Sequence, residues 1–427
     1  MRLLDTSEIT LHEFDSHRAP VYAIVSHRWT DEEVTYQNFL SGTNRDGKGW
    51  QKIIQGCRIA RLRNIKWLWI DTCCLDKHSS AELTESVNSM FNYYKVAKQC
   101  YAFLPDVQVQ HSDPAFYDQL QNSTWFTRGW TLQELLASTL VNFYNAKFQL
   151  IGVKTRESLF CEALSKITGI GITYLQRPRE LRLASIAERM RWASLRETTR
   201  VEDMAYCLLG IFDVNMPLIY GEGRKAFTRL QLEIISKSED ESIFAWTSDK
   251  PLWKGLLAPS PYAFAGHEAI EQRDIFQRAP FSMTNKGLQL SLPVRADSIG
   301  RKGTTLLFPL NCVRISTSNG SIRPREDQIA LRIYVKALPD IYNSGLRVFI
   351  GDAVREPFGS DQLLYSEMVH RRFIIGRRKS GRAYYKLRLA AEWSHDLYGC
   401  SSTVGVFERA DAAEGHTYAI YFKQGGM

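Results

Sequence analysis

The chain has 427 residues, 44% of them hydrophobic and 12% aromatic, and a formal net charge of +8. This composition supplies enough apolar residues for sizeable cores and excludes a disordered or low-complexity protein. No run of apolar residues is long enough to span a bilayer and no apolar leader opens the chain, so we expect a cytoplasmic protein without a membrane span. The eight cysteines are scattered through apolar runs, which predicts small buried side chains and no metal site.

The first part of the chain alternates strand and helix patterns. Near-continuous apolar runs predict strands covered on both faces, as in a parallel sheet, and helix patterns lie between them. This alternation predicts an α/β fold with a doubly wound sheet. The predicted strands are 21–26, 67–70 and 100–104, and the predicted helices between them are 50–62 and the segment that follows a capping box at Ser79–Glu82.

Polar side chains follow the ends of these predicted strands. Ser26 and His27 end the first, Asp71 follows the second and Asp106 follows the third. In an open α/β sheet, ligands bind outside the carboxyl ends of the strands. We therefore expect these four residues to cluster at one edge.

The pattern changes twice along the rest of the chain. Residues 156–242 show helical periodicity without a Gly- or Pro-rich linker, which predicts an extension packed on the first domain, residues 1–155. Residues 243–427 show short alternating segments punctuated by turn residues, which predicts a β-rich C-terminal domain.

A basic segment at 371–388 is rich in Arg and Lys and contains no acidic residue. Its pattern predicts a β-hairpin with a basic tip. Contact with nucleic acid or anionic lipid is one interpretation. A solvated hairpin is preferred because no nucleic-acid-binding motif accompanies the segment, so we expect no specific nucleic acid partner.

Common catalytic motifs are absent from the sequence. The segment Gly221-Glu-Gly223-Arg-Lys225 lacks the spacing of a phosphate-binding loop, and no GxGxxG motif follows a strand. No GxSxG nucleophile elbow occurs either. P-loop nucleotidases, dinucleotide dehydrogenases and serine hydrolases are therefore disfavoured.

Three separated segments resemble the fungal HET (heterokaryon incompatibility) domain family. They are Tyr22-Ala-Ile-Val-Ser26-His27-Arg-Trp29, Trp69-Ile-Asp71-Thr-Cys-Cys-Leu-Asp76-Lys, and Ser123-Thr-Trp-Phe-Thr-Arg128-Gly-Trp130-Thr-Leu-Gln-Glu134-Leu-Leu. The resemblance covers residues 22–152 and continues into the helical extension that often follows this domain. It implies a stand-alone protein, without NACHT or WD repeats, that acts in non-self recognition and regulated cell death.

HET domains are considered remote relatives of TIR domains, which have a flavodoxin-like parallel sheet. Some TIR domains hydrolyse NAD⁺ with a Glu in a WxxxE element, and Trp130 to Glu134 matches that element. The resemblance thus implies Glu134 as catalytic residue and NAD⁺ as substrate, with no further cofactor. It also implies a substrate-binding set made of Ser26, His27, Arg28, Asp71, Arg128 and Trp130.

Local structure offers another explanation for two of these carboxylates. Thr131 to Glu134 is itself a capping box, flanked by Trp130 and Leu135 as a hydrophobic staple, unless the helix begins earlier in the chain. Asp71 has the same ambiguity, because its carboxylate can accept from the loop N–H groups of 72–74.

Two main functions remain open. An NAD⁺ hydrolase predicts a partly exposed Glu134 beside Ser26 and Asp71. A non-catalytic death-signalling adaptor that self-associates or binds a protein partner or trigger predicts a buried or backbone-capped Glu134. A third alternative is an accessory role in another pathway, since fold alone does not decide function.

Overall fold

The computed structural model describes residues 1–155, 158–247, 257–266 and 268–273 and, further on, the strands named below. The chain forms two compact units. Unit 1 consists of Met1–Ala184 and Leu195–Leu230, and unit 2 of Ser185–Ser194 and Gln231–Met427. The predicted boundaries at 155 and 242 stay predictions. Within the described residues, no helix combines the length and apolarity needed to cross a membrane.

Unit 1 is built on a seven-stranded mixed sheet with the order β2-β1-β4-β3-β5-β6-β7. Its four central strands, β4-β3-β5-β6, are parallel, whereas β1, β2 and β7 join antiparallel at the margins. The α/β prediction with a parallel sheet is therefore confirmed. The strands are β1 (Arg2–Asp5), β2 (Leu11–Glu13), β3 (Tyr22–His27), β4 (Trp67–Trp69), β5 (Gln99–Phe103), β6 (Val141–Tyr144) and β7 (Leu150–Lys154).

Strand β3 lies at the centre of the parallel group and every one of its residues is buried. It pairs with β4 on one side and β5 on the other, with Ser26 opposite Ala102 and His27 opposite Phe103. The chain passes from β3 to β4 and then crosses back to β5, so the strand order reverses at β3. In doubly wound sheets this reversal is the point where ligands bind.

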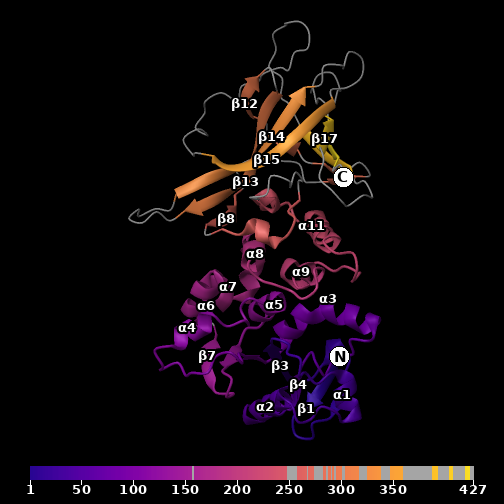
Figure 1. Cartoon of the computed structure of the whole chain (residues 1–427), viewed down its shortest axis with the longest axis vertical. Helices are drawn as coiled ribbons and strands as arrows, with labels where there is room; N and C mark the ends of the chain where they lie inside the picture. Colours follow the sequence, from indigo (N-terminus) through magenta and orange to yellow (C-terminus); the bar gives the residue numbers. More distant parts are fainter. Residues whose placement is uncertain are drawn as a thin grey trace. The chain divides into compact units, whose positions relative to one another are not determined.

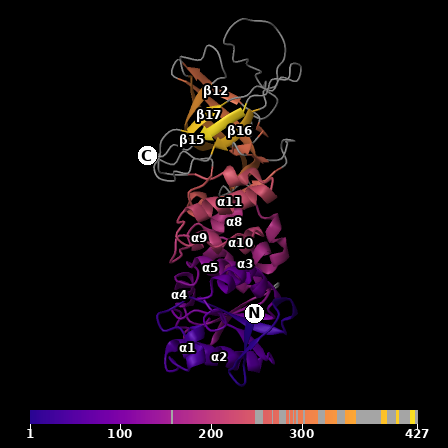
Figure 2. The same cartoon turned by 90° about the vertical axis from the view of Figure 1, so that its right-hand side faces the viewer.

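Helices cover both faces of the parallel strands. Helix α2 (Lys48–Leu62) packs on one face, where a Cβ atom added to Gly56 would lie 3.0 Å from the Leu68 side chain and 3.6 Å from that of Val25. Helix α3 (Ser80–Val96) packs on the other, and its Tyr94 hydroxyl donates to the Val25 carbonyl at 2.9 Å. Figure 1 shows α2 and α3 on opposite sides of β3 and β4. The two helices are also well separated in the second view (Figure 2).

The predicted capping box at Ser79 agrees with the structure, since Ser79 accepts from the Glu82 N–H at the start of α3. Helix α8 begins with a similar side-chain cap, in which Ser185 accepts from the Glu188 N–H. The further helices of the described residues are α1 (Tyr36–Ser41), α4 (Phe116–Gln121), α5 (Gly129–Ala137), α6 (Phe160–Thr168), α7 (Ile172–Gln176), α8 (Ile186–Ala193), α9 (Asp203–Tyr206), α10 (Leu209–Phe212) and α11 (Lys225–Lys237), with the short 3₁₀ turns η1 (Ser16–Arg18), η2 (Pro178–Leu183), η3 (Glu241–Phe244) and η4 (Pro261–Phe264).

Residues beyond 195 contribute to unit 1. Asn88 of α3 exchanges two hydrogen bonds with the Met216 backbone, of 3.2 and 3.1 Å. A Cβ atom added to Gly210 of α10 would lie 2.0 Å from Phe91 Cβ, so α10 and α3 meet at a glycine. Helix α10 and the segment around Met216 are thus packed on α3 within unit 1.

Unit 2 contains α8 and strands further along the chain. The N-terminus of α8 is tied to later residues, since the Ile186 N–H donates to Asp240 at 2.6 Å and the Ala187 N–H to Ser242 at 3.0 Å. The strands pair as β12-β13-β14-β15-β17 with β8 on β13, as β10-β9, and as β11-β16-β18. They are β8 (Ala269–Gln272), β9 (Ser282–Thr284), β10 (Gly287–Gln289), β11 (Ser291–Leu292), β12 (Arg295–Gly300), β13 (Gly303–Ser316), β14 (Arg325–Ala337), β15 (Arg347–Phe358), β16 (Leu387–Glu392), β17 (Thr403–Val406) and β18 (Ala419–Lys423).

Two predictions for this part of the chain are not decided by the structure. The β-rich domain over 243–427 stays a prediction. The basic hairpin falls largely on residues 371–386, which lie outside the described residues.

Candidate functional site at the carboxyl edge of the sheet

Helix α5 carries Glu134, and its start differs from the predicted capping box. The helix begins at Gly129, with Arg128 at the N-cap position and no side-chain cap. Thr131 lies inside the first turn of the helix. Its hydroxyl group donates to the Trp125 carbonyl oxygen at 2.6 Å and lies 2.9 Å from the Arg128 carbonyl oxygen. The capping box at Thr131 is therefore wrong, because Glu134 lies one turn further into the helix than a capping residue would.

Glu134 is buried against β3. Only 7% of the residue is exposed, and the Ser26 hydroxyl donates to its carboxyl group. Ser26 in turn accepts from the Trp125 indole N–H at 2.9 Å. Burial raises the pKa of Glu134 to about 8, helped by the nearby negative charge of Asp71 and opposed by Ser26 and Arg128. At neutral pH this carboxyl group is thus mostly protonated.

His27 points to the opposite face of β3 from Ser26, as strand alternation requires. Its Nε2 atom lies 3.6 Å from Glu33 Oε2 and 3.7 Å from Asp71 Oδ1, and its side chain is 2% exposed. Neither ring nitrogen has a hydrogen-bond partner within the described structure. Burial and then the charge of Lys52 lower the pKa of His27 despite the two carboxylates, so the imidazole is neutral at neutral pH.

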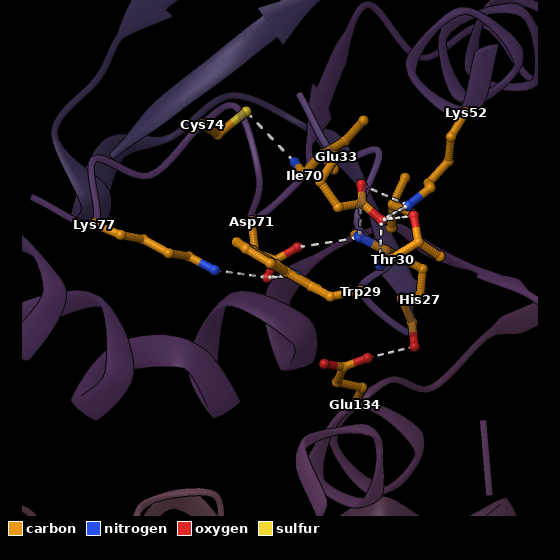
Figure 3. A network of polar contacts seen from close by, with 12 residues as sticks. His27, Trp29, Thr30, Glu33, Lys52, Ile70, Asp71, Cys74, Lys77 and Glu134 are labelled. Carbon is orange, nitrogen blue, oxygen red and sulfur yellow. Dashed lines mark hydrogen bonds and ion pairs between the residues drawn. The ribbon is translucent and has the colours of Figure 1, made fainter. Parts of the chain in front are cut away.

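Glu33 and Lys52 form a close ion pair beside His27. Lys52 Nζ lies 2.7 Å from Glu33 Oε2, and the Thr30 N–H donates to Oε1 at 3.0 Å. Burial would raise the pKa of Glu33, but His27 and Lys52 outweigh it and hold this pKa well below its ordinary value. Figure 3 shows this group set apart from Glu134.

The start of α2 brings Lys52 to this position. A Cβ atom added to Gly49 would lie 2.2 Å from the Glu32 carbonyl oxygen, so the first turn of α2 rests directly on the backbone of the loop after β3. The glycine permits this close approach, which sets Lys52 one turn later beside Glu33.

Asp71 leaves the end of β4 and is half-buried. Its Oδ2 atom accepts from the Trp29 indole N–H at 2.7 Å and lies 3.4 Å from Lys77 Nζ. Asp71 thus contacts these side chains rather than the loop N–H groups of 72–74. Burial would raise the pKa of Asp71, but the charge of Lys77 and the Trp29 hydrogen bond lower it, so Asp71 is ionised.

The remaining predicted residues are placed differently from one another. Arg128 is half-buried, and its charge acts on both Asp71 and Glu134. Arg28 is exposed on the loop after β3. Trp130 is half-buried, and burial raises the pKa of Asp203 on α9 while Tyr220 and Trp130 oppose this rise.

Asp106 makes its contacts with the turn before α5. It is exposed and accepts from the Ser123 hydroxyl and the Thr124 N–H, both at 2.7 Å, and thereby fixes this turn. No hydrogen bond or ion pair among the described residues joins Asp106 to Ser26, His27 or Asp71, so the expectation that all four cluster stays a prediction.

The segment after residue 195 holds the start of α5. Arg196 is buried and donates to the Arg128 carbonyl at 2.9 Å and to the Thr131 hydroxyl at 3.0 Å. The Gly129 N–H donates to the Glu197 carbonyl at 2.8 Å, and the Glu197 N–H to the Thr127 carbonyl at 2.7 Å. A Cβ atom added to Gly129 would lie 2.6 Å from Thr198 Cγ2, so this contact needs the glycine.

Sequence reasoning missed part of this edge. Glu33 and Lys52 carry no motif, and only the packing of α2 on the preceding loop brings them together. Arg196 lies far along the chain from α5 and gives no signal either. Trp29 and Trp125 stand inside the quoted motifs, which was the available clue to their contacts with Asp71 and Ser26. Among the described residues, no group of three or more His, Cys, Asp or Glu suits a metal ion.

Comparisons with known proteins agree on one family. The model of the family "Heterokaryon incompatibility protein (HET)" matches residues 22–115, a segment that includes Ser26, His27 and Asp71 and ends before Glu134. The chain is 44% identical over 245 residues to the "Vegetative incompatibility protein HET-E-1" of Podospora anserina. This match covers 55% of the chain but only 18% of that relative. No solved structure matches the chain. The chain therefore carries a HET domain, which opens at β3 and includes the end of β4 where Asp71 lies.

Proposed function

We propose that this protein acts in heterokaryon incompatibility, in which contact with a non-self partner leads to regulated cell death in a fungus. The observation that carries this proposal is the 44% identity over 245 residues to a vegetative incompatibility protein. The 245 residues aligned with this relative are more than the family match at 22–115 contains.

The proposed activity is hydrolysis of NAD⁺ with Glu134 as the catalytic residue. The C1′–N bond to nicotinamide breaks, its electron pair stays on the leaving ring nitrogen, and water adds its oxygen to C1′ while losing a proton. An ionised Glu134 stabilises the positive charge that develops on the ribose in this step. The hydrogen bond from Ser26 and the electrostatic coupling to Asp71 and Arg128 support this role, since perturbed titration is common at functional sites.

A remote relation to TIR domains is part of the same proposal. The order β4-β3-β5-β6 supports it, because flavodoxin-like sheets reverse at the equivalent strand. Cytoplasmic action, self-association and response to a protein partner or trigger complete the proposal.

A non-catalytic adaptor role has a specific observation in its favour. Glu134 is 7% exposed and its pKa is raised to about 8, so in this conformation its carboxyl group is largely neutral and covered. A death-signalling adaptor would use the same residue only to pack α5 on β3. The hydrolase needs an opening movement that lets substrate reach the Ser26–Glu134 pair.

Conditional expression of the whole chain in a filamentous fungus tests both forms of the proposal. We expect cell death with the wild-type chain, preceded by a fall in cellular NAD⁺, and survival with Glu134→Gln at equal protein level. The matched control is Glu85→Gln, which alters an exposed glutamate on α3 and should kill as the wild type does. Death with Glu134→Gln supports the adaptor, and survival with the wild type contradicts an incompatibility function.

A further inference from the structure

Trp29, Asp71 and Lys77 form a small cation site, here called the Trp29 site, that the chain fills with its own ammonium group. Lys77 Nζ lies 3.1 Å from the centroid of the Trp29 ring and 3.4 Å from Asp71 Oδ2. A cation between an aromatic face and a carboxylate is attracted by both the ring quadrupole and the opposite charge. Figure 3 shows Lys77 reaching toward Asp71 beside Trp29.

The carboxylate of this site is held in place independently of Lys77. The Trp29 indole N–H donates to Asp71 Oδ2 at 2.7 Å, so ring and carboxylate are fixed to one another. Lys77 is the least constrained of the three residues, because its side chain is 37% exposed and its ammonium group is carried on a long flexible chain of methylene groups. The ammonium group can therefore leave while the two groups that attract it stay.

A buried imidazole next to the Trp29 site, that of His27, makes no hydrogen bond within the described structure. Asp71 Oδ1 faces His27 Nε2 at 3.7 Å, and the His27 side chain is 2% exposed with neither ring nitrogen hydrogen-bonded. Buried polar atoms are nearly always satisfied, so an orphaned imidazole indicates a site that takes a polar partner. A neutral imidazole offers that partner one donor and one acceptor.

We infer that the Trp29 site binds a flat organic cation, which displaces the Lys77 ammonium group. A ring covers more of the Trp29 face than an ammonium group does. The exchange replaces one positive charge by another, so the charge balance around Asp71 and the nearby Arg128 is kept. A polar substituent on the ring would satisfy His27.

The cationic nicotinamide ring of NAD⁺ is such a group, an identification that rests on the proposed function. It is flat, positively charged and carries a carboxamide that both donates and accepts hydrogen bonds. Cleavage of the C1′–N bond returns the electron pair to the ring nitrogen and makes the ring neutral. The product then loses the attraction to Trp29 and Asp71, and Lys77 can return.

Calorimetric titration of the purified whole chain tests this inference with two probes of matched shape. N-methylnicotinamide is a cation and nicotinamide is its neutral counterpart. We expect the cation to bind about 3- to 10-fold more tightly, in keeping with the strength of cation–π contacts. Lys77→Ala should tighten binding of the cation, whereas Lys95→Ala, which removes an exposed lysine on α3, should leave it unchanged.

Variants of the two fixed groups complete the test. Asp71→Asn and Trp29→Leu should weaken binding of the cation, while Trp29→Phe, which keeps a ring, should retain part of it. Equal affinity for both probes, or no gain with Lys77→Ala in a folded protein, overturns the inference. If the chain binds the cation but consumes no NAD⁺, the Trp29 site is supported and the hydrolase function is contradicted. If the chain consumes NAD⁺ but does not bind the cation, only the Trp29 site is contradicted.

Discussion

Ser26 and His27 are neighbours in β3, and strand alternation sends their side chains to opposite faces of the sheet. Ser26 meets the protonated Glu134 under α5, and His27 meets the ionised Glu33 and Asp71 on the side of α2. One dipeptide thus joins two groups of opposite electrostatic character. Both groups lie where the strand order reverses.

Glu134→Gln should change how the stability of the protein depends on pH. The pKa of Glu134 rises from 4.5 in the unfolded chain to about 8 in the folded one. Between these values the unfolded chain has released the proton while the folded chain keeps it, so rising pH favours unfolding. Gln carries no such proton and can still accept from Ser26.

The measurement is urea unfolding at pH 5 and pH 8. We expect the wild type to lose free energy of unfolding between these pH values and Glu134→Gln to lose distinctly less, so that the variant is the more stable protein at pH 8. The exposed Glu85→Gln should behave as the wild type does. Equal pH slopes for wild type and Glu134→Gln would show that Glu134 is ionised in the folded state.

Which residues meet at the site could be predicted only in part from the sequence. Ser26, His27 and Asp71 were found because each follows an apolar strand, and parallel strands end at one edge. The Glu33–Lys52 pair could not be found, since it depends on the turn of α2 against the loop. The burial of Glu134 could not be predicted either, because the sequence around it fits both a capping box and the interior of a helix.

At the scale of elements, α5 is fixed at both ends by residues from other segments. Its start is held by Arg196 and Glu197, and its end by the buried Lys154 of β7, whose ammonium group donates to the Leu135 carbonyl at 2.9 Å and to that of Ser138. A cation at the C-terminal end also suits the helix dipole. The position of Glu134 thus depends on contacts far apart in the sequence.

Gly129→Ala should destabilise unit 1 through a clash at the start of α5. The added Cβ atom would lie 2.6 Å from Thr198 Cγ2. Forcing an extra methyl group into such a contact costs about 1–3 kcal/mol of unfolding free energy. Chemical unfolding of the single variant measures this loss.

The partner variant Thr198→Ser provides the control. It removes Cγ2 and keeps the hydroxyl that donates to the Arg200 carbonyl at 2.7 Å. Gly129→Ala combined with Thr198→Ser should regain most of the lost stability. If the double variant is as unstable as Gly129→Ala alone, the contact with Thr198 does not set the start of α5.

Element prediction worked where local signals and tertiary packing agree. The strands β3, β4 and β5 appear as apolar runs because both faces of a parallel sheet are covered, and Ser79 marks the start of α3 by its cap. The predicted start of α5 was wrong because the Glu197 carbonyl, not a side-chain cap, accepts from the first N–H group of the helix. No local pattern reports such a partner.

At the scale of the whole molecule, the sheet unit does not end where the helical pattern begins. Residues 195–230 belong to unit 1, where they supply Arg196, the Met216 backbone that binds Asn88, and Gly210 against Phe91. The sequence suggested an extension packed on the first domain but not which residues bind it.

A fragment of residues 1–155 should therefore fail to fold stably on its own. It lacks the partners of the Gly129 N–H and of Phe91, and would expose the faces of α3 and α5 that they cover. Thermal unfolding followed by circular dichroism, together with limited proteolysis, should show no cooperative transition and rapid cleavage. A cooperative transition equal to that of the whole chain would contradict this interpretation of unit 1.

The catalytic role of Glu134 is tested most sharply by NAD⁺ consumption, measured on the purified whole chain between pH 7 and pH 9 at high protein concentration to favour assembly. We predict that the wild type and Glu85→Gln consume NAD⁺ with a rate that rises through about pH 8, as Glu134 becomes ionised. Glu134→Gln should be slower by at least about 100-fold. Folded wild-type protein that consumes no NAD⁺, or Glu134→Gln as active as the wild type, would contradict the account.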